Sequence, residues 1–158
     1  MSKVDKMSDR QYLFGVIFIV ANRVDTMLER EFKRFGITTK QWFLSVIIKN
    51  LFDKPPTMKE VAKEMGSSHQ NVKQVALKLE QKGLLILQKD KRDARVTRLK
   101  LTESSYDFWK KLSEEGTTFT QALFKNIDKD ELEVARRVMQ KLQLNINEMD
   151  SDGVENHE

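Results

Sequence analysis

The stretch that decides the fold is TMKEVAKEMGSSHQNVKQVALKLEQKGLLILQKDKRDARVTRLKLT, residues 57–102. Its first four residues, Thr57 to Glu60, have the capping-box form, in which the two end side chains satisfy free amide groups at a helix start. Gly66 then supplies the left-handed residue that commonly ends a helix. A second helix starts within a few residues, and both Ser67 and Ser68 fit the rule for its N-cap. Two helices joined by such a short turn are typical of a helix-turn-helix unit.

Two strand-like runs follow this unit. Residues 84–87 are all apolar, and residues 96–101 alternate apolar and polar side chains in the manner of a half-buried strand. The loop between them is highly charged and contains few apolar side chains, so the pattern predicts a wing whose charged side chains bind a partner. A merely solvated hairpin tip is the alternative interpretation. The candidate binding cations of the wing are Lys89, Lys91, Arg92 and Arg95.

Long helices are predicted on both sides of this stretch. Ser8 and Thr38 start capping boxes of the same kind, and after each of them the apolar side chains recur every three to four residues. The first helix is apolar over more than one face, which in a small protein often indicates contact with another subunit. Thr102 caps a fifth helix, which the sequence allows to bend at Gly116, and Asp128 opens a sixth.

The predicted fold class is mainly α with a small β-hairpin wing. It combines a winged helix-turn-helix head with long N- and C-terminal dimerisation helices. The end of the chain is expected to fray because it is acidic and short of apolar residues. We therefore expect one domain, 1–158, with a winged helix-turn-helix part at 37–101, dimerisation helices at 8–36 and 102–148, and a frayed tail at 149–158.

The cysteine count and the apolar runs narrow the class of protein. The chain of 158 residues has no cysteine, which excludes disulfides, thiolate metal sites, cysteine nucleophiles and thiol-based redox sensing. Its longest apolar run, residues 16–21, is much shorter than the roughly 20 residues that span a bilayer, and charged residues follow it in helical register. We therefore expect a cytoplasmic protein with no membrane contact and no signal peptide.

Positive charge is concentrated in the middle of the chain. Residues 54–102 contain 12 Lys and Arg against 5 Asp and Glu, whereas residues 103–158 contain 7 against 13. A surface that is only solvated would mix the two signs more evenly. Because a nucleic-acid-binding surface must supply cations at the spacing of the phosphates, this concentration predicts double-stranded DNA as the partner of the helix-turn-helix unit.

The second helix of the unit supplies the residues that meet DNA bases in such proteins. Gln and Asn side chains pair with adenine through its N6 and N7 atoms, and lysines suit phosphates or guanine. The amide-rich helix therefore predicts an operator with A·T pairs beneath it. The candidate DNA-binding residues on its outward face are Ser68, His69, Gln70, Asn71, Lys73, Gln74 and Lys78.

Other functions have weaker support in the sequence. His69 could be a metal ligand or a general base, but no second His and no Cys accompanies it at helical spacing, and His157 lies in the predicted tail. An enzyme acting on a small acidic substrate lacks any catalytic constellation, because no phosphate loop, nucleophile elbow or carboxylate pair is present. We therefore expect no catalytic residue, no metal and no cofactor. The alternative function is a winged-helix module that binds a protein partner, although that function predicts a wing poor in cations.

Three correctly spaced segments resemble the MarR family of transcriptional regulators. Residues 56–62 resemble the start of the family's third helix, and residues 79–84 resemble the close of its recognition helix. Asp93-Ala94-Arg95, followed by Leu99-Lys100-Leu101-Thr102, resembles the family's Asp-x-Arg wing motif and the Leu-Thr cap after it. Ser105 stands where the family often has glycine. The cysteine with which many relatives sense peroxide is absent, so that mechanism is not expected here.

The resemblance implies how the protein would act. It implies a homodimer built from the first, fifth and sixth helices, a palindromic DNA site, and a repressor that a small aromatic or phenolic acid releases. It also implies that Arg95, together with Arg92, enters the minor groove while Asp93 holds the wing arginine in place. The physical reason is independent of the family, because narrow A·T-rich minor grooves attract arginine.

The resemblance further implies a ligand crevice between the dimer helices and the DNA-reading head. Ordinary core or dimer packing is the alternative interpretation of each candidate, because aromatic side chains at helical spacing usually pack. The candidate pocket residues are Phe14, Phe18, Asn22, Trp42 and Trp109.

Overall fold

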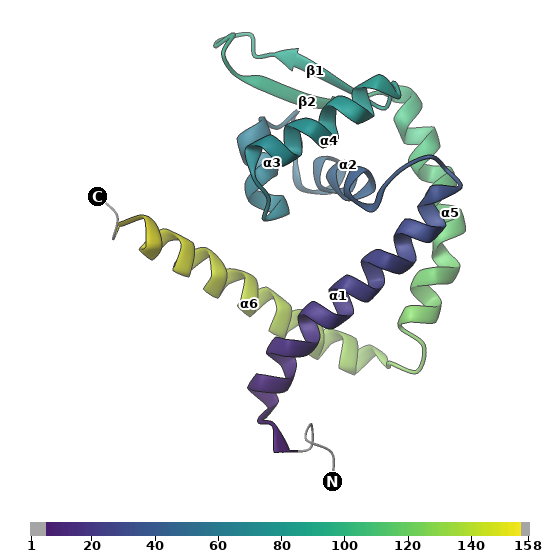
Figure 1. Cartoon of the computed structure of the whole chain (residues 1–158), viewed down its shortest axis with the longest axis vertical. Coiled ribbons are helices and arrows are strands. Elements are labelled where there is room, and N and C mark those ends of the chain that lie inside the picture. Colours follow the sequence, from purple (N-terminus) through teal and green to yellow (C-terminus); the bar gives the residue numbers. More distant parts are fainter. Residues whose placement is uncertain (1–5, 156–158) are drawn as a thin grey trace. The chain divides into compact units, whose positions relative to one another are not determined.

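The computed structural model describes the backbone of residues 6–155, together with their side chains except those of residues 115 and 152–155. Within these residues the chain is mainly helical with one hairpin, as predicted (Figure 1). None of the described helices combines the length and the apolar character that crossing a bilayer requires. The elements are α1 (Asp9–Lys33), α2 (Thr39–Leu51), α3 (Met58–Met65), α4 (His69–Gln81), β1 (Leu85–Lys89), β2 (Thr97–Leu101), α5 (Glu103–Leu123) and α6 (Lys129–Glu155).

Side-chain caps start the helices where the sequence predicts. Ser8, Thr38 and Thr57 each accept a hydrogen bond from the amide three residues on, and the Gln or Glu at that position accepts one from the cap's own amide. Of the two serines that fit the cap of α4, Ser68 is the one that accepts, from the Asn71 amide at 3.2 Å. The capping boxes are therefore confirmed, and the choice between the serines is settled.

The helix-turn-helix unit consists of α3 and α4. Gly66 ends α3 in the left-handed region, with φ at 58°, where a residue with a Cβ is disfavoured. This sharp stop lets α4 begin directly after Ser68. The inward faces of the two helices contribute Val61, Ala62, Val72, Ala76 and Leu79 to a common core.

The hairpin forms the predicted wing with small shifts in its bounds. The first strand begins at Leu85 rather than at residue 84, because the Leu84 amide donates to the Leu79 carbonyl oxygen at 3.0 Å and so completes the end of α4. The antiparallel register runs from the pair Leu85 and Leu101 to the pair Lys89 and Thr97. The turn between the strands is therefore residues 90–96.

The second edge of β2 is paired as well, which the sequence did not predict. The Leu99 amide donates to the Pro56 carbonyl oxygen at 2.8 Å, and Thr57 and Arg98 form an isolated antiparallel bridge. The segment between α2 and α3 is thus tied to the wing through the backbone.

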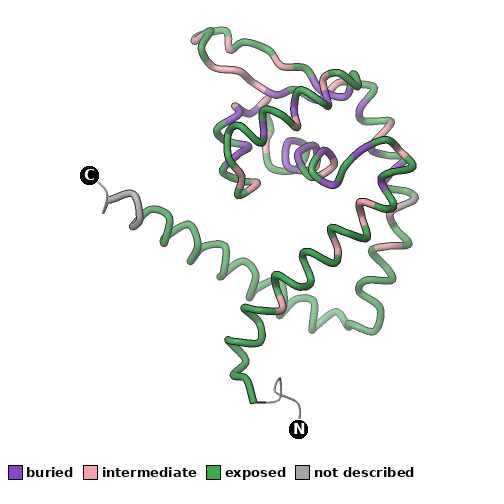
Figure 2. Tube along the Cα trace, viewed as in Figure 1, coloured by how far each residue is buried: buried purple, intermediate pink, exposed green. Residues whose placement is uncertain are grey.

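Contacts divide the chain into two compact units, Met1–Leu112 and Ser113–Glu158, here called the N-terminal and the C-terminal unit. The division falls inside α5, within the predicted dimerisation segment 102–148. The reason is that Trp109 and Leu112, in the first part of α5, are buried in the core of the N-terminal unit. Most of that core comes from α2, α3, α4 and the hairpin, where the buried segments in Figure 2 are concentrated.

The C-terminal unit contains the rest of α5 and all of α6. A capping box at Asp128 opens α6, with the Glu131 amide donating to Asp128 Oδ1 at 2.9 Å. The helix α6 continues to Glu155, into the segment from residue 149 that the sequence predicts to fray. The fraying itself stays a prediction. Residues 156–158, and with them His157, lie outside the described residues.

Candidate nucleic-acid interface

α4 presents two faces of different character. Val72, Ala76 and Leu79 are fully buried on the inner face, where α4 packs against α2, α3 and β1. The opposite face is polar and open to solvent. It holds all seven residues that the sequence proposed for DNA contact, each of them exposed: Ser68, His69, Gln70, Asn71, Lys73, Gln74 and Lys78.

The exposed side chains of α4 have the chemistry that a base-reading helix needs. The amides of Gln70, Asn71 and Gln74 can each donate and accept, as the major-groove edge of adenine requires. Lys73 and Lys78 add positive charge on the same helix. Among the described residues, no group of three or more His, Cys, Asp or Glu is placed to hold a metal ion. His69 is exposed in the first turn of α4, on the same polar face.

The turn of the wing is shaped by one carboxylate. Asp90 Oδ1 accepts hydrogen bonds from the Arg92 amide at 2.8 Å and from the Asp93 amide at 3.1 Å. The Asp90 amide in turn donates to the Val96 carbonyl oxygen at 2.9 Å. The turn is therefore an ordered structure, although it has few apolar side chains.

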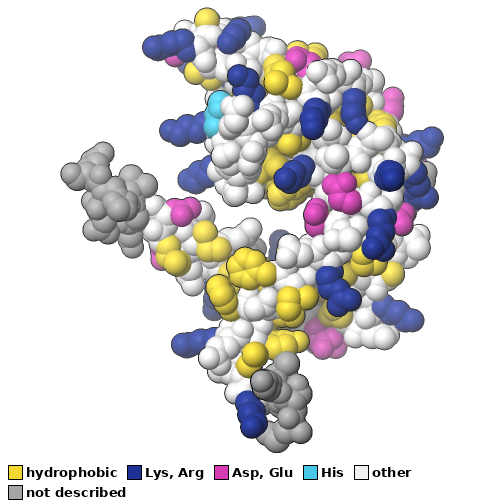
Figure 3. Space-filling model, viewed as in Figure 1, with side chains coloured by type: hydrophobic (Ala, Val, Ile, Leu, Met, Phe, Trp, Pro, Cys, Tyr) yellow, Lys and Arg dark blue, Asp and Glu magenta, His cyan; other side chains and the backbone are white. Residues whose placement is uncertain are grey.

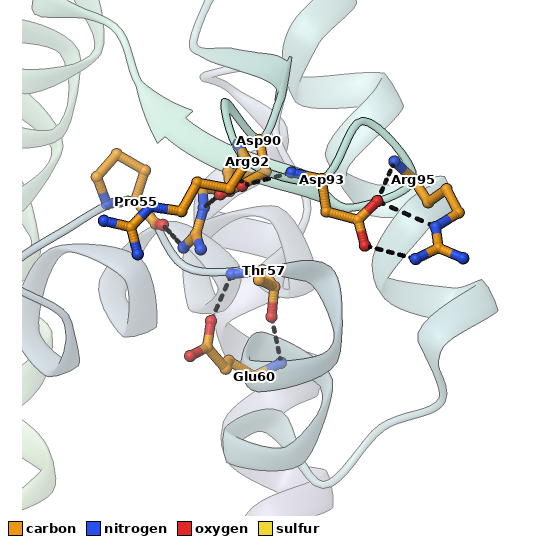
Figure 4. Close-up of polar contacts among 8 residues, drawn as sticks. Pro55, Thr57, Glu60, Asp90, Arg92, Asp93 and Arg95 are labelled. Atoms are coloured by element: carbon orange, nitrogen blue, oxygen red, sulfur yellow. Dashed lines mark hydrogen bonds and ion pairs between the residues drawn. The ribbon is translucent and has the colours of Figure 1, made fainter.

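Asp93 and Arg95 form the pair that the family resemblance implies. Arg95 Nε donates to Asp93 Oδ1 at 3.0 Å, and Nη2 donates to Oδ2 at 3.1 Å (Figure 4). This bidentate contact holds the pKa of the Asp93 carboxyl below its ordinary value and raises the pKa of Arg95. The Arg95 side chain is nevertheless 91% exposed. Its guanidinium is thus oriented by Asp93 while it stays accessible to a ligand.

A second acid–arginine pair in the wing was missed from the sequence. Arg98 Nε donates to Asp90 Oδ2, and Arg98 Nη1 donates to the Pro55 carbonyl oxygen at 2.9 Å. The hydrogen bond from Arg98, and then those from the Arg92 and Asp93 amides, lower the pKa of Asp90 to about 2. Eight positions separate the two partners, and only the strand register could have shown that they meet.

Two further cations of the helix-turn-helix unit were not among the DNA-binding candidates proposed from the sequence. Lys59 and Lys63 are exposed on α3, the helix that precedes α4. The other predicted wing cations, Lys89, Lys91 and Arg92, are exposed as well. Figure 3 shows Lys and Arg side chains gathered around the hairpin tip and beside the histidine. In a helix-turn-helix the first helix crosses the phosphate backbone, so these α3 lysines extend the basic surface in the expected direction.

The five candidate pocket residues fall into two groups. Trp109 is buried in the core of the N-terminal unit next to Phe108, and Trp42 is half-buried against that core, where it packs on Phe32. Phe14, Phe18 and Asn22 are exposed on α1. For the two tryptophans the structure therefore agrees with the alternative interpretation, ordinary packing.

Two surface grooves of the N-terminal unit lie elsewhere. One, of about 570 Å³, lies along the end of α1 and is lined by residues such as Asp25, Glu29 and Ile37. The other, of about 680 Å³, is lined by residues from α2, β2 and the start of α5, among them Phe52 and Tyr106. Neither groove is lined by any of the five candidates, so they do not form a shared pocket in either place.

Solved structures with the same fold are transcriptional regulators. A MarR protein from Peptoclostridium difficile superposes with a TM-score of 0.76 at 21% identity, over 91% of this chain and 92% of that protein. A MarR/EmrR family transcriptional regulator from Acinetobacter gives 0.77 at 16% identity, over 90% of this chain and 99% of that one. MepR from S. aureus, solved in complex with DNA, gives 0.73 at 18% identity, over 89% and 99%.

No protein-family model matches the chain, and all three identities are low. The similarity therefore concerns the course of the backbone, which is retained across nearly the full length of each protein. The chain has the winged helix-turn-helix fold of the MarR-family transcriptional regulators.

Proposed function

We propose that this protein is a homodimeric, sequence-specific DNA-binding transcriptional regulator of the MarR type. In this proposal α4 of each copy lies in a major groove, and each wing reaches the neighbouring minor groove. The observation that carries the proposal is the exposed polar face of α4, which stands opposite a fully buried face and next to a basic wing. The fold shared with MepR, which was solved with DNA, supports it.

Base selection is assigned to the three amide side chains of α4. A bidentate Gln or Asn contact with adenine discriminates against the wrong base by about 1–3 kcal/mol. Gln70, Asn71 and Gln74 therefore favour a half-site that contains A·T pairs, and Lys73 and Lys78 contact phosphates or guanine. The salt dependence of binding comes from the lysines and the wing cations, because each neutralised phosphate releases counterions.

The wing arginine is assigned to the minor groove. Asp93 fixes the orientation of the Arg95 guanidinium, which reduces the entropy lost when that side chain enters the groove. The exposed Arg92 is the second cation at the same tip. A narrow A·T-rich minor groove has the enhanced negative potential that attracts such side chains.

Dimerisation is assigned to the long helices because their apolar side chains are uncovered in the single chain. Phe14 on α1 and Met149 on α6 are each 71% exposed. Exposed apolar side chains that gather along one helix usually mark an interface. Further exposed apolar residues are Leu13, Ile17, Phe18, Ile19 and Val20 on α1, and Leu132, Val134, Val138, Met139, Leu142, Leu144 and Ile146 on α6.

The regulatory part of the proposal is repression that a small aromatic or phenolic acid relieves. Its support is the resemblance of residues 56–102 to the MarR family. Such a ligand acts by favouring a dimer whose two α4 helices no longer match half-sites about 34 Å apart. A panel of aromatic acids tests it, because a true effector both raises the thermal stability of the protein and releases DNA. If no acid does either, this class of effector is wrong.

Selection of binding sites from a random pool of DNA duplexes tests the DNA-binding part. We expect a palindromic site with A·T pairs in each half, and an affinity that falls steeply as salt rises. Replacing Gln70, Asn71 and Gln74 together by alanine should remove the sequence preference while weak, salt-dependent binding persists.

A matched control changes an exposed amide outside the proposed contact face. Asn50→Ala removes a side chain of the same chemistry from α2 of the same unit, and Asn50 is exposed. This control should select the wild-type site. Failure of the wild-type protein to enrich any site, or an affinity that salt leaves unchanged, would show that the fold serves another purpose, such as binding a protein partner.

A further inference from the structure

The guanidinium of Arg98 joins two segments that are distant in the sequence. Its Nε donates to Asp90 Oδ2 in the turn of the wing, and its Nη1 donates to the Pro55 carbonyl oxygen, between α2 and α3. Figure 4 shows Pro55 on one side of these contacts and Asp90 on the other. The side chains of Arg98 and Asp90 are 36% and 14% exposed. The pair is therefore partly shielded, unlike the open pair of Asp93 and Arg95.

Both carboxylate oxygens of Asp90 accept hydrogen bonds, and they accept them from different groups. Oδ1 accepts the amides of Arg92 and Asp93, which shapes the turn, whereas Oδ2 accepts the Arg98 guanidinium. Asp93 then holds Arg95. A continuous series of hydrogen bonds thus runs from Pro55 to the arginine assigned to the minor groove.

Arg98 also stands next to the start of the helix-turn-helix unit. Its backbone bridges to Thr57, the cap of α3. The pKa of Glu60, which completes that cap, is lowered chiefly by the hydrogen bond from the Thr57 amide, and the charge of Arg98 lowers it further. Arg98 therefore faces two carboxylates, one in the wing turn and one at the start of α3.

We propose that Arg98 is a positioning residue, which fixes the wing turn relative to α3 and α4 so that both DNA-contacting elements meet the duplex together. This inference rests on the proposed DNA-binding function. In it, Arg98 acts through Asp90 and not by contact with bases. A surface ion pair alone contributes little to stability. Two directed hydrogen bonds from the rigid Arg98 guanidinium restrict the orientation of the wing turn. A fixed orientation is required if the wing and α4 are to contact the same duplex together.

The geometry explains why arginine stands at this position. A guanidinium is planar and presents several N–H donors in fixed directions, so one side chain can serve the Asp90 carboxylate and the Pro55 carbonyl at once. A lysine keeps the charge but is a point donor on a flexible stem. Lysine should therefore restore the function of Arg98 only in part, and glutamine should restore less.

Amide hydrogen exchange tests the proposal without DNA. In Arg98→Gln, the amides of Arg92 and Asp93 should exchange about tenfold faster than in the wild type, because the acceptor Asp90 is no longer held. Amides of the buried face of α4, such as that of Ala76, should keep their rates if the fold is intact. Arg98→Lys should lie between the two proteins.

DNA affinity is the second measurement, made with the duplex that the wild-type protein selects. Arg98→Gln should weaken binding about tenfold, which is the loss expected for one hydrogen bond to a charged group. Lys100→Gln is the matched control, since it removes one exposed cation from the same strand and changes the net charge equally. Lys100→Gln should lower the DNA affinity only by the amount expected for the loss of one positive charge.

A double-mutant cycle separates positioning from general charge. Asp90→Asn keeps an oxygen that can accept the turn amides but loses the ion pair. If Arg98 acts through Asp90, Arg98→Gln should have a much smaller effect in the Asp90→Asn background than in the wild type.

The outcomes distinguish this inference from the proposed function. Wild-type exchange rates at Arg92 and Asp93 in Arg98→Gln, or equal losses of DNA affinity in Arg98→Gln and Lys100→Gln, overturn the positioning role. If the wild-type protein selects no DNA but the exchange rates change as expected, Arg98 does hold the wing turn and the DNA-binding proposal is the part that fails.

Discussion

The winged part of the N-terminal unit, residues 37–101, buries many of its apolar side chains, whereas the long helices α1 and α6 leave many of theirs exposed. In the winged part, Leu44, Val61 and Leu99 are completely buried within one chain. On α1 and α6, residues such as Phe14 and Met149 remain mostly exposed. Burial of apolar surface is the main term that favours folding, and the winged part achieves it within one chain. The exposed apolar side chains of the long helices are the surface that the proposed second copy would cover.

The difference shows which properties each region determines. The winged part supplies a rigid frame on which α4 and the wing are held, so its polar face keeps its shape without a partner. The long helices determine how two such frames are spaced, if a second copy covers them as proposed. Changes in the first region should therefore alter folding, and changes in the second should alter assembly.

The largest expected effect comes from opening the core of the winged part. Leu79→Ala removes a completely buried side chain of α4 and should lower the free energy of unfolding by about 2–5 kcal/mol. Leu77→Ala, on the same helix, removes a side chain that is 40% exposed, and should cost about 0.5 kcal/mol. Denaturant unfolding measures both. Equal losses in the two variants would mean that the winged part lacks the core described above.

The next effect concerns the uncovered face of α1. Phe14→Glu combined with Phe18→Glu should raise the dissociation constant of the dimer roughly a thousandfold, because buried aromatic anchors at interfaces often contribute about 2 kcal/mol each. Light scattering over a range of protein concentrations measures the change. Arg23→Glu alters an exposed polar residue of the same helix and should leave the dimer intact. A wild-type protein that is monomeric at every concentration would contradict the assignment of this face.

A smaller effect is expected at the start of α4, where the sequence allowed two caps. Ser68→Ala should lower the free energy of unfolding by about 1 kcal/mol, because the Asn71 amide loses its acceptor. Ser67→Ala leaves that hydrogen bond in place, and the same unfolding experiment should show a much smaller change. The reverse order of the two losses would place the cap at Ser67.

The smallest effect is a pH dependence within the wing. Arg98, and then the Arg92 and Asp93 amides, lower the pKa of Asp90 from its ordinary 3.8 to about 2. A carboxyl with a lowered pKa stabilises the fold above its ordinary value, and the contribution is lost as the pH falls through the lower value. The Arg92 amide resonance, whose N–H donates to Asp90 Oδ1, should therefore titrate with a midpoint near 2, and the midpoint should rise towards 3.8 in Arg98→Gln. A wild-type midpoint near 3.8 would show that Asp90 is not paired in solution.

Much of the fold could be predicted because its signals are local. Capping boxes at Ser8, Thr38 and Thr57 involve residues three positions apart, so a single sequence shows them. The left-handed stop at Gly66 is local too. The polar face of α4 followed from helical periodicity, and its seven residues are indeed exposed. Whether they contact DNA stays a prediction.

The features that were missed depend on contacts between distant positions. The pair of Asp90 and Arg98 forms only because the strands adopt one register, and the contact with Pro55 requires the edge of β2 to meet the segment before α3. The extension of the core to Trp109 likewise depends on how α5 packs. The five candidate pocket residues share a pattern in the sequence. Yet Trp109 is in the core, Trp42 is half-buried against it and the other three are exposed, because periodicity does not say what lies opposite a helix face.

Local signals in the chain were enough to predict the order of helices and strands, their capping boxes, the polar face of α4 and the concentration of positive charge in the middle of the chain. These follow from hydrogen bonds and periodicities within a few residues, and from composition. The folded chain was needed to show that Ser68 is the cap, that α5 contributes to the core of the N-terminal unit, and that Arg98 ties the wing turn to the segment before α3. Each of these depends on which groups meet after the chain has folded, and contacts between distant residues are selected by packing and register rather than by local preference.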